Sequence, residues 1–81
     1  MNDLHLRLEL AGPLRKPDGE RTVEVSCPEG TRLNDILKRE LDYSPRQQRF
    51  LRIVQDGKPI HPEDRLESEK PIQVFLRLGG G

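Results

Sequence analysis

The last three residues, Gly79, Gly80 and Gly81, have the clearest chemical potential, and they follow directly on the alternating apolar segment 72–78. Glycine has no Cβ, so a glycine tail can pass extended through a passage too narrow for other residues. Such a tail also leaves the terminal carboxylate sterically open. We expect a domain at residues 1–78 followed by a flexible glycine tail at residues 79–81. The pattern predicts a protein whose reactive group is the carboxylate of Gly81, which the active site of another protein acts upon.

A carboxylate by itself is a poor acyl donor, because the group that must leave is oxide. The usual remedy is adenylation by a partner enzyme that uses ATP and Mg²⁺, after which a thiol or a persulfide attacks the activated carbonyl. This chemistry requires no catalytic side chain and no bound cofactor on the chain itself. The alternative is that these glycines form a disordered end without a function. Their position directly after an apolar strand pattern argues against this alternative.

Other groupings of reactive residues give no comparable signal. His5 and His61 lie far apart, with no neighbours at metal-ligand spacing, so we expect both to be solvated and predict no metal site. No Ser-His-Asp grouping is evident, and we therefore expect no enzymatic activity. Cys27 is the single cysteine, which fits a reducing compartment and an unreactive thiol. The acidic residues after His61 are expected to form a solvated face: Glu63, Asp64, Glu67 and Glu69.

Length and composition restrict the possible functions further. The chain has 81 residues, its 14 basic and 14 acidic side chains cancel, and aromatic residues make up 4%. A chain this short forms one domain with a small core, which leaves little room for a deep substrate pocket. Without a basic excess or many aromatic rings, we expect no nucleic-acid partner. No apolar run has the length of a signal peptide or a membrane span, so we expect a cytoplasmic monomer without membrane contact.

Hydrophobic periodicity predicts four longer strands and one helix. Apolar and polar residues alternate at residues 4–10, 22–26 and 72–78, which is typical of half-buried strands. Residues 50–55 are expected to form the third strand in chain order. Between the second and third of these strands, one apolar stripe at helical spacing predicts a helix: Leu33, Ile36, Leu37 and Leu41. Thr31 is its expected N-cap, and Ser44-Pro45 is expected to prevent further helix.

Turn residues place a short additional strand near the end of the chain. Asp56-Gly57 predicts a tight turn that returns as a short strand at residues 58–60, where Pro59 suits a sheet edge. Residues 61–71 are polar and rich in turn formers, with Leu66 expected to anchor them inward. The element order predicts an α+β fold of two layers, a four- to five-stranded mixed sheet with one helix packed across one face. The other face of the sheet should be largely solvated.

Four segments of the chain resemble ubiquitin. Residues 45–51, Pro-Arg-Gln-Gln-Arg-Phe-Leu, resemble the segment that leads ubiquitin from its helix into its third strand, and residues 56–60 resemble the turn and short strand that follow. Residues 64–66 are similar to its Gly-Arg-Thr-Leu element, and residues 76–81 to its Leu-Arg-Leu-Arg-Gly-Gly ending. The element order matches along the whole chain, so the sequence resembles the ubiquitin-like β-grasp proteins.

The resemblance implies a protein modifier whose Gly81 is activated by an ATP-dependent adenylating enzyme. A conjugating enzyme would then join Gly81 through an isopeptide bond to lysines of target proteins, and a deconjugating protease would release it. The resemblance also implies that partner proteins recognise the residues of the tail: Leu76, Arg77, Leu78, Gly79 and Gly80. Arg77 would contact an acidic groove of the activating enzyme. The alternative is that Arg77 is only a solvated residue on the outward side of the strand. Lys58, which follows the turn glycine, would be a chain-linkage site.

Two departures from ubiquitin leave other functions open. Only residues 67–71 separate Leu66 from the last strand, a shortening closer to the prokaryotic sulfur carriers of this fold that also end in Gly-Gly. Gly79 replaces the arginine that precedes the ubiquitin Gly-Gly. The alternative function is a sulfur carrier that forms a C-terminal thiocarboxylate for cofactor or tRNA thiolation. A non-covalent interaction domain whose tail has no role is the third.

A partner patch is predicted from alternation. If Ile72, Val74 and Leu76 face the helix, Phe75 faces outward. Both faces of the third strand carry apolar residues. Because a helix covers only one face of the sheet, one pair of these apolar residues must lie on the uncovered face. We expect Leu51, together with Leu14 from the first loop, to join Phe75 in an exposed cluster, which would resemble the hydrophobic patch of ubiquitin. The alternative is that the last turn or a dimer contact covers Phe75.

Overall fold

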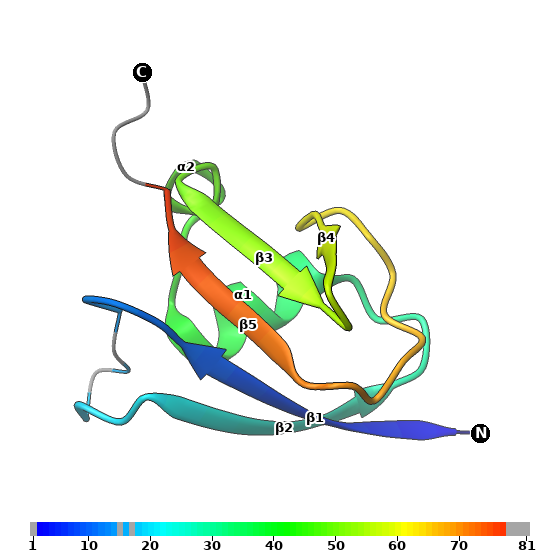
Figure 1. Ribbon diagram of the computed structural model, residues 1–81. Helices are drawn as coiled ribbons and strands as arrows, with labels where there is room; N and C mark the ends of the chain where they lie inside the picture. The colour runs from blue at the N-terminus through cyan, green and yellow to red at the C-terminus, as the bar shows by residue number, and fades with distance from the viewer. Residues whose placement is uncertain (1, 15, 17, 78–81) are drawn as a thin grey trace.

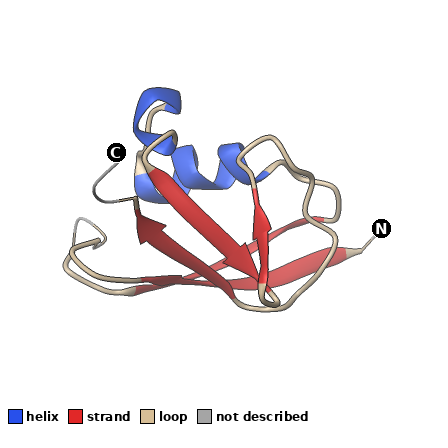
Figure 2. Ribbon diagram, turned by 45° about the horizontal axis from the view of Figure 1, so that its top comes forward, coloured by secondary structure: helices blue, strands red, loops and turns tan. Residues whose placement is uncertain are grey.

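The computed structural model describes residues 2–14, 16 and 18–77 as a five-stranded mixed sheet covered by helices (Figure 1). The strands are β1 (Asp3–Leu10), β2 (Thr22–Pro28), β3 (Leu51–Gln55), β4 (Lys58–Ile60) and β5 (Ile72–Leu76). Their order in the sheet is β2-β1-β5-β3-β4; β1 and β5 are parallel, and the other neighbours are antiparallel. Helix α1 (Leu33–Leu41) crosses one face, and the short helix α2 (Pro45–Gln48) lies on the same side (Figure 2). This arrangement confirms the predicted α+β fold class.

The core lies between α1 and one face of the sheet. Along β1 every second residue is buried, and the register sets these leucines opposite the buried residues of β2, for example Leu6 opposite Val25. The apolar stripe of α1 closes the core from above, with Ile36 and Leu37 both fully buried. Burying one such side chain stabilises a fold by about 1.5–3 kcal/mol. The opposite face of β1 and β2 carries mostly exposed residues, as predicted.

The start of α1 differs from the prediction, because Thr31 is not its N-cap. Arg32 holds that position without a side-chain cap, and the Thr31 hydroxyl instead donates to the Pro28 carbonyl at 2.6 Å. The first amides of α1 donate to carbonyls of a loop distant in sequence: Leu33 to Asp64 at 3.0 Å and Asn34 to Pro62 at 2.7 Å. The first backbone N–H groups of α1 are therefore satisfied by tertiary contacts, and not by the side chain of Thr31 as predicted.

The segment after α1 also differs from the prediction, because Pro45 starts a helix. The Ser44 side chain accepts from the Gln47 amide at 3.2 Å, and the Gln47 side chain accepts from the Ser44 amide at 2.8 Å. This is a reciprocal capping box, and proline is well suited to the first helical position because its missing N–H has no acceptor there. The third strand then begins at Leu51, one residue later than expected.

The tight turn and the anchored loop agree with the sequence prediction. Asp56 and Gly57 have φ of 55° and 76°, the positive pair that a two-residue turn between antiparallel strands requires. β4, which contains Pro59, is an edge strand. In the loop before β5, the side chain of Leu66 is only 2% exposed and joins the core.

Candidate functional site

The chain runs toward its C-terminus along β5, an inner strand of the sheet. β5 lies between β1 and β3, and the Arg77 amide donates to the Phe50 carbonyl at 2.7 Å, which continues the β3–β5 pairing past Leu76. The terminus is therefore held by the middle of the sheet up to Arg77. The other predicted tail residues, Leu78, Gly79, Gly80 and Gly81, lie outside the described residues.

The two predicted tail-recognition residues inside the described part have different environments. Leu76 is half-buried and lies directly opposite Leu51 of β3. Arg77 is exposed, and the ion pairs found among the described residues join Lys16 to Asp18, Arg39 to Glu40 and His61 to Asp64. Within that part of the chain, the Arg77 guanidinium has no carboxylate partner. It remains available to a partner protein, and its predicted role stays a prediction.

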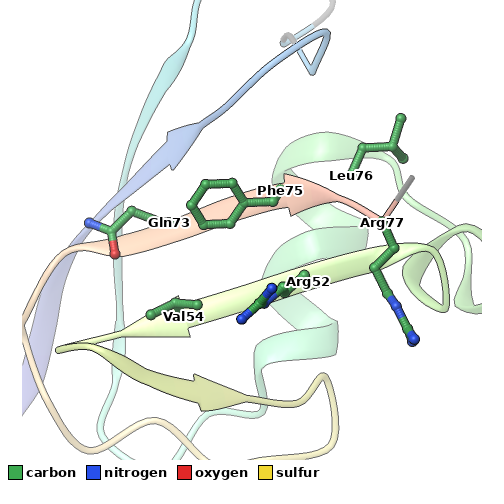
Figure 3. A pocket seen from close by; sticks show the side chains of 6 residues that line it. All are labelled: Arg52, Val54, Gln73, Phe75, Leu76 and Arg77. Carbon is green, nitrogen blue, oxygen red and sulfur yellow. The ribbon is translucent and has the colours of Figure 1, made fainter. Parts of the chain in front are cut away.

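A shallow hollow lies next to Arg77 on the sheet face that points away from α1 (Figure 3). The β3–β5 register sets Arg52 directly opposite Phe75 and Val54 directly opposite Gln73. Since directly opposed residues point to the same face, these four side chains form one surface. We call this surface, with the two residues that complete the lining, the outer groove: Arg52, Val54, Gln73, Phe75, Leu76 and Arg77.

The expected placement of Leu51 in an exposed cluster with Phe75 is wrong. Leu51 lies on the helix side of β3, where it packs half-buried against the core, and Leu14 is also half-buried against the core. Phe75 alone of the three points outward, with 39% of its surface exposed. The outward position on β3 that faces Phe75 belongs to Arg52, which the sequence analysis did not select.

The inner face of β3 also carries a buried polar residue. Gln55 shares the inner face with Ile53 and is only 8% exposed. Its side-chain amide donates to the carbonyls of Ser68 at 3.0 Å and Lys70 at 2.9 Å. These two bonds satisfy the buried amide and fix the loop before β5. The sequence left the phase of this strand open because the residues of both faces are apolar, with Phe50 and Val54 on one face and Leu51 and Ile53 on the other.

The remaining candidate residues lie away from the outer groove. Lys58 is exposed on β4 directly after the tight turn, and its chain-linkage role stays a prediction. Cys27 is buried in the core at the end of β2. His5 Nδ1 lies 2.9 Å from the Ser26 hydroxyl, and its backbone amide donates to Glu69. The described residues contain no cluster of three potential metal ligands, and no helix among them is long and apolar enough to span a membrane.

The strand order, the helix crossing one face and the inner C-terminal strand define a ubiquitin-like β-grasp fold, as the sequence predicts. No protein-family model matches the sequence, and no curated protein matches it significantly. Among solved structures, SAMP1 from Haloferax volcanii superposes with a TM-score of 0.70 at 15% identity, over 95% of this chain and 99% of that chain.

Two further solved structures have the same fold. A structure of small archaeal modifier protein 1 from H. volcanii gives a TM-score of 0.70 at 15% identity, over 93% of this chain and 99% of that chain. A proposed molybdopterin converting factor subunit 1 from Pyrococcus furiosus gives 0.67 at 17% identity, over 93% of this chain and 99% of that chain. At these identities the likeness establishes the fold of this chain and leaves its role to chemical argument.

Proposed function

We propose that this protein is a ubiquitin-like modifier that is joined through the carboxylate of Gly81 to amines of target proteins. The observation that carries the proposal is the chain path: an inner strand of a β-grasp sheet leads directly toward a sequence that ends in three glycines. The fold it shares with a protein named a modifier supports the same function.

The proposed reaction needs an activated acyl group. The Gly81 carboxylate attacks the α-phosphorus of ATP on a partner adenylating enzyme, which releases pyrophosphate and leaves an acyl adenylate. An enzyme thiolate then displaces AMP and forms a thioester, which a conjugating enzyme carries to the target. A lysine amine of the target finally displaces the thiol, loses a proton and forms an isopeptide bond. A deconjugating protease would hydrolyse the same bond.

The chain contributes presentation and recognition to this scheme. The pairing of β5 with both β1 and β3 fixes the point from which the tail starts, so a partner can locate the tail from the folded body. Arg77 offers an exposed guanidinium at that point, and it has no ion-pair partner among residues 2–14, 16 and 18–77. Gly79 and Gly80, which have no side chain, would provide a narrow connection from Leu78 to the reacting carboxylate.

Two observations favour a sulfur carrier as the second candidate function. Residues 67–71 form a short connection into β5, and one structure of the same fold is a proposed subunit of the molybdopterin converting factor. The adenylation step would be shared between the two functions. The outer sulfur of an enzyme persulfide would then displace AMP from the acyl adenylate and form an acyl disulfide. A second thiol of the partner enzyme would cleave the S–S bond, form a disulfide with the inner sulfur and leave a thiocarboxylate at Gly81.

One experiment separates these functions. The full chain with an N-terminal epitope tag is incubated with an extract of its source cells, ATP and Mg²⁺, and the products are resolved on a reducing denaturing gel. The modifier function predicts tagged species of higher mass that resist reductant. These species should be absent without ATP, and absent for a variant lacking Gly80 and Gly81.

The intact mass of the unconjugated chain tests the second candidate function, the sulfur carrier. An exchange of one oxygen for sulfur at the terminus, without conjugates, would favour the sulfur carrier and contradict the modifier proposal. The absence of both products in an extract that contains adenylating activity would leave the non-covalent interaction domain as the better explanation.

A further inference from the structure

We propose that β2 pairs along its free edge with β2 of a second copy of this chain, so that two molecules form one continuous sheet. The two strands would run antiparallel, related by a twofold axis at Val25. The pairing concerns the edge of the sheet and not the C-terminus, and it therefore goes beyond the proposed function. A dimer departs from the monomer expected from the sequence, because only the tertiary structure shows which strand lies at the edge.

The backbone of β2 carries hydrogen-bonding groups that point away from the sheet. β2 is the first strand in the sheet order and pairs with β1 on one side (Figure 1). The Leu10 amide donates to the Arg21 carbonyl at 2.7 Å, which makes these two residues a bonded pair. Bonded and non-bonded pairs alternate along an antiparallel ladder, so the register bonds Val25 to β1 and leaves Glu24 unbonded. The outward N–H and C=O groups of β2 are those of Thr22, Glu24 and Ser26.

The two edges of the sheet differ in how well they are protected against pairing. β4, the other edge strand, has three residues and contains Lys58 and Pro59, and both residue types discourage pairing with another strand. β2 has seven residues in an unbroken register with β1, and its one proline, Pro28, is its last residue. Within residues 2–14, 16 and 18–77, no backbone hydrogen bond reaches the outward groups of β2. This edge is therefore suited to pairing with a further strand.

A twofold axis at Val25 pairs the full length of β2 with itself. Thr22 of one copy would lie opposite Pro28 of the other, and Glu24 would lie opposite Ser26. Because Glu24 and Ser26 both direct their backbone groups outward, each of these pairs would exchange two hydrogen bonds. The side chains of directly opposed residues point to the same face, so the open faces of the two sheets would join.

The side-chain charges favour this register. Arg7 of β1 lies directly opposite Glu24, and His5 Nδ1 lies 2.9 Å from the Ser26 hydroxyl. In the proposed dimer each Glu24 would lie between Arg7 of its own molecule and Ser26 of the other. An axis at Glu24 would instead set the two glutamates directly opposite each other, which is destabilising. Equal numbers of acidic and basic residues leave the chain without a net charge that would oppose association.

The contact involves one strand from each molecule, so we expect a weak dimer with a Kd on the order of 0.1–1 mM. β1 separates β2 from β5 in the sheet. The C-terminal strand of each copy would therefore lie away from the contact, and the dimer would present two such strands.

The test uses the full ¹⁵N-labelled chain over a series of concentrations. Sedimentation velocity measures the oligomeric state, and amide hydrogen exchange locates the contact. We expect the dimer to slow the exchange of the Glu24 and Ser26 amides, which gain acceptors. The Val25 amide already bonds to β1, and its exchange should change little.

Two substitutions of one residue test the register. Ser26→Lys would place a cation opposite Glu24 of the second copy, and Ser26→Glu would place a carboxylate there. Both variants lose the same contact with His5. Ser26→Glu should dimerise about tenfold more weakly than Ser26→Lys, since the contact occurs twice by symmetry. Equal dimerisation of the two variants would contradict an axis at Val25, because residue 26 would lie opposite Thr22 in the register with its axis at Glu24.

A second pair of variants tests the outward amide. Glu24→Pro removes an N–H that points away from β1, and proline is tolerated at such edge positions. It should abolish the dimer, whereas Glu24→Ala keeps the N–H and should still dimerise. Circular dichroism and thermal unfolding establish that both variants are folded, and the Ser26 variants keep the test decisive if Glu24→Pro does not fold.

Three outcomes would overturn the proposed dimer: a monomer at every concentration, slowed exchange confined to β4, or equal dimerisation of Glu24→Pro and Glu24→Ala. A monomer whose Glu24 and Ser26 amides are protected only in a cell extract would also contradict it, because the edge would then belong to a different partner. The variant lacking Gly80 and Gly81 separates the dimer from the proposed function. It should dimerise as the full chain does and form no conjugates.

Discussion

At the scale of single residues, the turn between β3 and β4 depends on two positive φ angles. Asp56 tolerates φ of 55° because a short polar side chain is among the least strained in the left-handed region. Gly57, at 76°, has no Cβ and so avoids the strain altogether. The turn is therefore fixed by backbone conformation and not by packing, since nothing lies within 4 Å of the point where a Cβ of residue 57 would be placed.

We predict that Gly57→Ala lowers the free energy of unfolding by about 1–2 kcal/mol, the cost of a left-handed conformation for a residue with a Cβ. Urea unfolding followed by circular dichroism measures the change. Lys58→Ala is the matched control, because it alters the adjacent exposed residue without changing the turn conformation, and it should be close to neutral. Equal stability of Gly57→Ala and the wild-type protein would contradict this account of the turn.

Tyr43 gives a residue-scale prediction for pH. Partial burial against the core raises the pKa of the Tyr43 hydroxyl above its ordinary value, because desolvation disfavours the phenolate. The folded state thus favours the protonated form. The stability that this preference contributes is complete below the unfolded pKa and is lost as the pH rises through the folded pKa.

We therefore expect the wild-type protein to lose stability relative to Tyr43→Phe above about pH 10, where the tyrosine of the unfolded chain ionises first. Below about pH 9 the difference between the two proteins should be constant. Denaturant unfolding at a series of pH values tests this expectation, and the two proteins share every lysine that titrates in the same range. A difference that does not change with pH would show that Tyr43 is not desolvated.

At the scale of elements, the two helices obtain their N-terminal caps in different ways. α1 has no side-chain cap, and its first amides donate to loop carbonyls of Asp64 and Pro62. α2 is only four residues long and contains its own capping box between Ser44 and Gln47. A helix this short cannot be stable by propensity alone, so the cap and its packing must hold it.

We predict that Ser44→Ala lowers the free energy of unfolding by about 1 kcal/mol, because the Gln47 amide loses its acceptor. Ser44→Asp keeps an acceptor at the cap and adds a negative charge where the helix dipole favours it, so its stability should be close to that of the wild-type protein. Urea unfolding of both variants measures the effect. An equal loss in both would mean that α2 does not depend on its cap.

At the scale of the whole molecule, the core and the proposed reactive end are separate parts of the chain. All the residues of the core cluster lie between Leu4 and Val74. The described chain beyond Val74 adds an exposed ring, a half-buried leucine and an exposed arginine. Changes at the end of the chain should therefore alter function without altering the fold.

We predict that deleting residues 79–81 changes the free energy of unfolding by less than about 0.5 kcal/mol, as for surface changes that remove no buried contact. The contrasting variant is Leu8→Ala, in a strand that pairs on both sides. Leu8 is 0% exposed, and the change should cost about 2–5 kcal/mol. Urea unfolding compares the two, and a deletion that destabilises the protein as strongly as Leu8→Ala would show that the tail is part of the folded body.

The sequence by itself determined the features that depend on neighbouring residues. Alternation identified β1, β2 and β5, helical spacing identified α1, and Asp56-Gly57 identified the turn, because each signal comes from residues close together in the chain. The candidate reactive residue, Gly81, also came from the sequence alone.

Only the tertiary structure decided which face of β3 is buried, because pairing with β5 and the bonds of Gln55 to a distant loop fix that phase. The same dependence on distant partners placed Arg52 beside Phe75 and supplied loop carbonyls to the start of α1. Such contacts join residues far apart in the chain, and no local pattern of residue types encodes them.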